Sequence, residues 1–224
     1  MASARDEALA ALRQRTTELL RNSAGGDRVL AHTERVYGLA RRLARQEEAD
    51  RFVVGAAALL HEWPGDAPPA EAALRAAWPA IPDPAVAAVG DTLAALAAPA
   101  AAPDSTLEAR VACDAHHLDE LGAIGIANLL LAGGARHEPL YEHTDPFALM
   151  RSLAPDQYLI ERLYALLAAL PRQLHTPTAR AIASRRSAIM LFYLEALRDE
   201  LAETLPDALL PEEHWLVPQE DSPR

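Results

Sequence analysis

The feature that most constrains this chain is an apolar run, 53–60, that ends in a histidine and a carboxylate, His61-Glu62. Residues three and four apart share one face of a helix, so Val54, Ala57 and His61 form one stripe. An imidazole that closes a buried stripe needs a partner, because burying an unpaired polar group costs about 1–3 kcal/mol. A divalent metal would satisfy both side chains, since neutral imidazole and ionised carboxylate are ordinary metal ligands.

Two other helical stripes each contain one residue of a type that binds metals. They are Val29, His32, Val36, Leu39 and Leu43, and then Leu107, Val111, Asp114, Leu118 and Leu121. Taken alone, His32 is as readily a core histidine bonded to a carbonyl, and Asp114 could be buried with an arginine partner. Together with His61 and Glu62 they form a set of two nitrogen and two oxygen ligands that a helix bundle can bring to one point.

Composition predicts an all-α protein with a single domain. Half of the 224 residues are hydrophobic, mainly alanine, and only 5% are aromatic. Alanine-rich sequence with three/four periodicity is typical of helices, and this length is enough for one sizeable core. We expect an N-terminal helix and turn over 1–26, a helical domain over 27–204 and a proline-rich acidic tail over 205–224.

Caps and breakers set the expected helix ends. Ser3 and Asp27 are candidate caps for the first two helices, and Ser105 with Glu108 has the spacing of a capping box. The predicted helices cover 3–22, 27–48, 50–62, 71–78, 83–98, 105–121, 125–131, 155–170 and 176–203.

Charge and residue usage exclude several classes of function. A net charge of −11 disfavours nucleic-acid polymers and anionic membrane surfaces as partners. All 21 cationic residues are arginine, so there is no lysine to bind phosphate in a Walker motif or to form a Schiff base. With the single cysteine Cys113 no internal disulfide forms, and neither a signal peptide nor a membrane span is evident. We expect a cytoplasmic protein, and the sequence leaves a homo-oligomer open.

Several segments resemble the HD superfamily of metal-dependent phosphohydrolases, and in particular its single-domain bacterial members. The similar segments are His32-Thr33-Glu34-Arg35-Val36, then 56–62 with the paired His61-Glu62, and then 106–127 around Asp114. Gly133-Gly134, Pro139-Leu140-Tyr141, Glu161-Arg162-Leu163 and Thr176 extend the resemblance through the C-terminal half.

The resemblance implies an HD-like helical bundle with one divalent metal ion, which could be Mn, Mg, Co, Fe or Zn. By position, His32, His61, Glu62 and Asp114 would be the metal ligands, and the two carboxylates would also be catalytic. Arg35 and Arg162 would contact a substrate phosphate, although Arg35 could instead pair with Glu34 or Asp119.

The chain departs from this family at informative places. The paired aspartate is Glu62, and the family's Asp-Ala-Asp-Arg-Leu-Asp segment begins here as Asp114-Ala115-His116-His117. Helical spacing from Asp114 points His117 toward the site and His116 away from it. We expect both to be surface histidines, and a replaced ligand or proton shuttle is the alternative. The absence of histidine from 63 to 113 argues against a second metal.

Three functions follow from these residues. The first is hydrolysis of a small phosphorylated compound, such as a nucleotide, by metal-activated water. The second is a catalytically weakened or inactive binding or scaffold protein, because Glu62 replaces the usual aspartate. The third is a di-iron redox enzyme, which the missing histidines disfavour.

Overall fold

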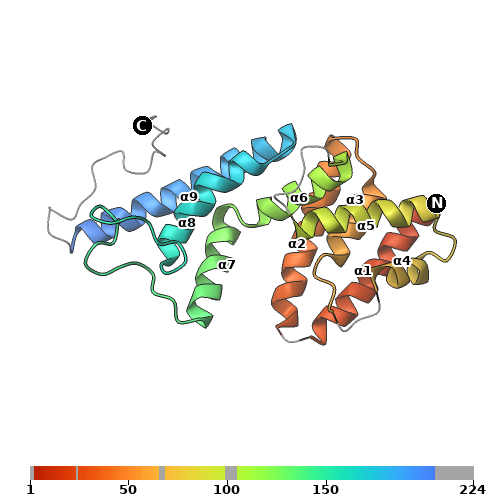
Figure 1. Ribbon diagram of the computed structural model, residues 1–224, viewed down its shortest axis with the longest axis horizontal. Coiled ribbons are helices and arrows are strands. Elements are labelled where there is room, and N and C mark those ends of the chain that lie inside the picture. The colour runs from red at the N-terminus through yellow and green to blue at the C-terminus, as the bar shows by residue number, and fades with distance from the viewer. Residues whose placement is uncertain (1–2, 24, 66–68, 99–104, 205–224) are drawn as a thin grey trace. The chain divides into compact units, whose positions relative to one another are not determined.

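The computed structural model describes residues 3–23, 25–65, 69–98 and 105–204. Within these ranges the chain forms nine α-helices and no strand, so the all-α prediction is confirmed (Figure 1). The helices are α1 (Ala4–Arg21), α2 (Gly26–Gln46), α3 (Arg51–Leu60), α4 (Ala70–Ala77), α5 (Asp83–Ala97), α6 (Leu107–Asp119), α7 (Gly122–Ala135), α8 (Leu159–Gln173) and α9 (Pro177–Ala202). None of these helices alone is both long and apolar enough to cross a membrane.

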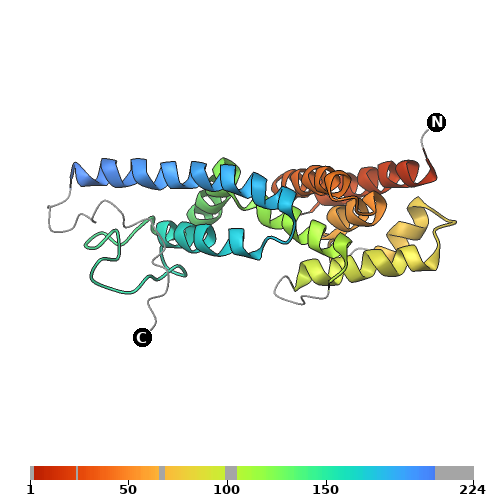
Figure 2. The same cartoon turned by 90° about the horizontal axis from the view of Figure 1, so that it is seen from above.

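The chain divides into two compact units. The first unit is Met1–Asp119 with Leu174–Arg180, and the second is Glu120–Gln173 with Ala181–Arg224, of which 205–224 lie outside the described residues. The first unit therefore holds α1 to α6 and the first turn of α9. In Figure 2, α9 is one unbroken helix.

Helix α3 is the centre of the first unit and contacts α1, α2, α5 and α6. Asp50 caps its N-terminus by accepting hydrogen bonds from the N–H groups of Phe52 and Val53. Every residue from Phe52 to Leu60 is buried, as expected for a helix that is apolar on all sides. Gly55 allows close packing, because an added Cβ would lie 3.3 Å from the side chains of Leu9 and Tyr37.

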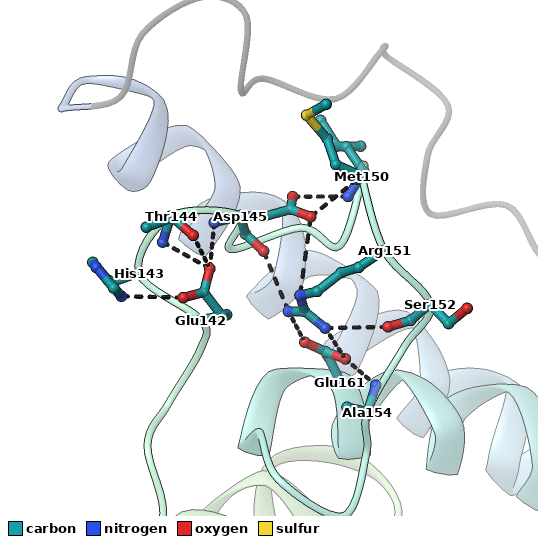
Figure 3. A network of polar contacts seen from close by, with 10 residues as sticks. Glu142, His143, Thr144, Asp145, Met150, Arg151, Ser152, Ala154 and Glu161 are labelled. Carbon is teal, nitrogen blue, oxygen red and sulfur yellow. Dashed lines mark hydrogen bonds and ion pairs between the residues drawn. The ribbon is translucent and has the colours of Figure 1, made fainter.

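The second unit packs α7 against α8 at a glycine. A Cβ at Gly133 would lie 2.3 Å from the Leu159 side chain, so only glycine fits there without rearrangement. The loop that joins these helices is held by Glu161, whose carboxylate is 1% exposed and accepts hydrogen bonds from Arg151 and from the Ala154 N–H (Figure 3). Asp145 accepts from the N–H groups of Leu149 and Met150 in the same loop.

Most predicted helices match the structure, and the differences lie at helix ends. The Ser3 cap is present, whereas α2 begins at Gly25 and Gly26, with Asp27 inside its first turn. At the start of α6 the Thr106 hydroxyl, rather than Ser105, accepts from the Ala109 N–H. Helix α7 is longer than the predicted 125–131 and α8 starts later than 155. The predicted tail, 205–224, lies outside the described residues.

Candidate metal centre

Two predicted ligands from two helices meet in the first unit. His32 lies on α2, and His61 is the C-terminal cap of α3, the point at which the apolar run ends. Their Nε2 atoms are 3.1 Å apart, and the ring centroids are 5.1 Å apart. The His61 side chain is 5% exposed and that of His32 is 21% exposed, so His61 is almost fully buried and His32 is in partial contact with solvent.

The other nitrogen of each ring is a hydrogen-bond donor. His61 donates its Nδ1–H to the Ala58 carbonyl at 2.8 Å, and His32 donates its Nδ1–H to the Asp119 carboxylate at 2.8 Å. A neutral imidazole has one N–H, so when both rings are neutral the two Nε2 atoms present lone pairs to each other. Two lone pairs at this distance repel unless a cation lies near both. Two nitrogens that each lie about 2.1 Å from one zinc ion in tetrahedral geometry are about 3.4 Å apart, close to the observed spacing.

Asp119, at the end of α6, fixes the orientation of His32. Its carboxylate also accepts two hydrogen bonds from Arg35, at 2.7 and 2.9 Å, and it is 3% exposed. Burial alone would raise the pKa of Asp119, but the hydrogen bonds from His32 and Arg35 outweigh it and lower the pKa to about 2. An ionised carboxylate behind a histidine is the usual arrangement that fixes the tautomer of a metal ligand.

A third histidine joins the pair, and it is one that helical spacing pointed away from the site. His116 on α6 lies with its ring centroid 5.4 Å from that of His32 and 5.5 Å from that of His61. One nitrogen from each of the three rings lies within 4.8 Å of the others. Burial lowers the pKa of His61 and of His116 to about 4, so both rings are neutral near pH 7. We call these three residues the histidine cluster.

Glu62 lies beside the histidine cluster. Its Oε1 is 3.9 Å from His61 Nε2, and its side chain is 43% exposed. This side chain is one methylene longer than the aspartate of the family pattern, and its carboxylate lies half exposed beside the cluster.

The structure does not bring Asp114 into the histidine cluster. Asp114 is fully buried and its carboxylate accepts from the His175 and Thr176 N–H groups, each at 2.8 Å, and from the Thr176 hydroxyl at 2.7 Å. His175 Nδ1 lies 3.1 Å from the same carboxylate. Asp114 thus anchors the start of α9 within the first unit, and these hydrogen bonds satisfy its buried carboxylate.

The expectation that His116 and His117 are surface residues was wrong. His117 is 4% exposed, and its Nδ1 has no hydrogen-bond partner. The error came from taking Asp114 as the reference for the site. Residues two apart lie on nearly opposite sides of a helix, whereas His116 and Asp119 are three apart and share a side. The spacing of His116 and Asp119 was the signal that could have found both residues.

The two predicted phosphate-binding arginines lie in different units. Arg35 pairs with Asp119 through Nε and Nη2, one of the two pairings that the sequence left open. Arg162 belongs to the second unit, where its Nη1 donates to Glu138 at 2.8 Å and its other nitrogens donate to main-chain carbonyls. A role for either arginine in substrate binding remains a prediction.

The helical fold is that of solved bacterial proteins, one of which is described as an HD-superfamily hydrolase. YpgQ from Bacillus subtilis, in a crystal structure with ADP, is 24% identical over 92% of this chain and 98% of its own, with a TM-score of 0.71. An HD-superfamily hydrolase from Bacillus thuringiensis is 24% identical over 88% of this chain and 98% of its own, also with a TM-score of 0.71.

A protein from Lactobacillus plantarum is 28% identical over 88% of this chain and 97% of its own, with a TM-score of 0.64. No family model and no curated protein matches the sequence. The chain has the fold of the bacterial HD-superfamily proteins, as the sequence predicted.

Proposed function

We propose that this protein is a metal-dependent hydrolase of the HD type that cleaves a phosphate bond in a small phosphorylated compound. The observation that supports the metal is the 3.1 Å distance between the Nε2 atoms of His32 and His61, whose Nδ1 atoms both bond to oxygen acceptors. The ADP found with YpgQ favours a nucleotide as the compound. A cytoplasmic location is part of this proposal.

The residues around the histidine cluster fit a divalent ion. His32, His61 and Glu62 would hold it, with Asp119 fixing His32 from behind. A divalent ion there supplies a water molecule with a lowered pKa and draws electrons from a phosphoryl oxygen. Glu62, half exposed beside His61, can accept a proton from the attacking water at Oε1.

Arg35 can position the substrate. It uses Nε and Nη2 to bind Asp119, and its side chain is 32% exposed. No contact found within the described ranges occupies its Nη1, so this N–H group can donate to a phosphate oxygen.

The direct test is to purify the protein without chelator, measure its metals, and assay phosphate release from a panel of nucleotides with several divalent ions. We expect His61→Ala to lose metal and any phosphate release, because it removes one of the two facing nitrogens. His143→Ala is the matched control, since His143 is an 87% exposed side chain of the second unit. Unchanged metal content in His61→Ala would refute the ligand assignment.

The second candidate is a weakened or inactive HD-fold binding or scaffold protein. Exposure of the Glu62 side chain favours it, because a solvated carboxylate holds an ion less firmly than a buried one. Metal-free protein of undiminished stability would support this candidate. Glu62→Asp distinguishes the two further, since increased phosphate release in that variant would mark the natural site as a weakened catalyst.

A further inference from the structure

We infer that His116 is the third protein ligand of the metal centre and that it gives the site a preference for zinc, cobalt or ferrous iron over manganese and magnesium. This inference rests on the metal site proposed above. It concerns a residue that the sequence pattern left as a surface histidine, and it names the class of ion.

Helix α6 contains both His116 and Asp119, the carboxylate that binds His32. His116 and Asp119 are three residues apart, so they lie on the same side of α6, and Asp119 binds His32 across the contact between α6 and α2. The side of α6 that faces His32 is thus the side that presents His116. His116 also makes edge-to-face contacts with the rings of His32 and His61, with interplanar angles of 89° and 87°. These contacts confirm that His116 lies on the side of α6 that faces His32.

The distances fit an ion with little rearrangement. The three nitrogens lie within 4.8 Å of one another, and the His32–His61 pair is already at 3.1 Å. Tetrahedral ligands at about 2.1 Å from zinc are about 3.4 Å apart, so a shift of at most about 1.4 Å by the His116 ring completes a three-nitrogen face.

The chemistry of the donors sets the preference. Three neutral imidazoles bring no charge, and the negative charge of Asp119 is already met by Arg35. Glu62 brings one oxygen and one negative charge. Manganese and magnesium are held by oxygen ligands, whereas imidazole suits zinc and iron, and affinity for a given nitrogen site rises from manganese through iron to cobalt. A histidine at 116 in place of an aspartate removes one hard, charged donor.

The test compares wild-type protein with His116→Asp, with His143→Asp as the matched control at an exposed histidine. Dissociation constants for zinc and manganese are measured by calorimetry on metal-free protein whose folding is checked by circular dichroism. We expect the ratio of the manganese constant to the zinc constant to fall about tenfold or more in His116→Asp and to stay unchanged in His143→Asp. An unchanged ratio in folded His116→Asp would overturn the inference.

A second measurement needs no variant. X-ray absorption spectroscopy of the zinc-loaded wild-type protein counts the imidazoles that bind the ion. Three imidazoles support the inference and two overturn it, even if His116→Asp fails to fold. Three bound imidazoles without phosphate release from any substrate would leave the inference standing while the proposed hydrolysis failed. Two bound imidazoles together with manganese-dependent hydrolysis would overturn the inference about His116 and support the proposed hydrolysis.

Discussion

Asp119 is the residue on which the geometry of the candidate centre depends most. Asp119 is buried, with 2% of the whole residue exposed. Its carboxylate fixes the tautomer of His32, and a hydrogen bond from Arg35 fixes the carboxylate in turn. The sequence presents it only as one of several carboxylates near an arginine. Its role is visible only when α2 and α6 are in contact, because the bond to His32 joins residues 87 apart in the sequence.

We predict that Asp119→Asn lowers metal affinity about 10–100-fold without removing a ligand. The reason is that a carboxylate hydrogen-bonded to Nδ1 makes the imidazole of His32 a more basic ligand. Isothermal titration with zinc measures the change. Asp83→Asn is the matched control, since the Asp83 side chain is 85% exposed and pairs with Arg75 in the first unit. Equal affinities in the two variants would show that Asp119 has no influence on the ion.

The sequence predicted His32 and His61 as ligands of one ion, because each closes or interrupts an apolar stripe on its own helix, and their Nε2 atoms lie 3.1 Å apart. Their role as ligands stays a prediction. The sequence did not predict the position of His116, because Asp114 was taken as the reference for α6 and the two residues occupy different sides of that helix. Only contacts between helices distinguish the aspartate that binds main-chain N–H groups from the histidine that faces other rings.

At the scale of elements, helix positions were largely predictable and helix ends were less so. Apolar periodicity fixes which residues are helical, and a long helix with a clear stripe, such as α2, follows directly from it. Ends depend on which side chain captures the first N–H groups. Glu108 was expected to close a capping box, but its carboxylate accepts instead from the Asp50 N–H, at the start of α3.

The loop before α8 offers a test of one buried element. Glu161 is 1% exposed and holds both Arg151 and the Ala154 N–H. We predict that Glu161→Gln lowers the free energy of unfolding by about 1–3 kcal/mol, because a charged acceptor is lost while its donors stay in place. The estimate allows for solvent at Arg151, whose side chain is 27% exposed.

Urea denaturation followed by circular dichroism measures this change. Glu71→Gln is the matched control, because Glu71 is 60% exposed and its pair with Arg75 is a surface pair four residues apart. Such exposed pairs contribute little to stability. If both variants lose the same stability, the buried network does not hold the loop.

For the whole molecule, the proposed ion is also a source of stability. An ion that binds only the folded state adds about 2.7 kcal/mol when its free concentration is 100 times the dissociation constant. For a chain of this length we therefore predict that zinc raises the Tm by about 5–10 °C and that a chelator reverses the rise. Differential scanning fluorimetry of wild-type and His61→Ala protein measures both. A zinc-induced rise of equal size in His61→Ala would place the binding elsewhere.

The bonds of Asp114 have a consequence for how the protein is made. This carboxylate is buried, and the N–H groups that satisfy it belong to His175 and Thr176, 61 and 62 residues further along. While a ribosome is still adding the residues between them, the nascent first unit holds an anion with no donors. We expect the unit to remain loosely structured, and available to chaperones, until residue 176 has left the exit tunnel.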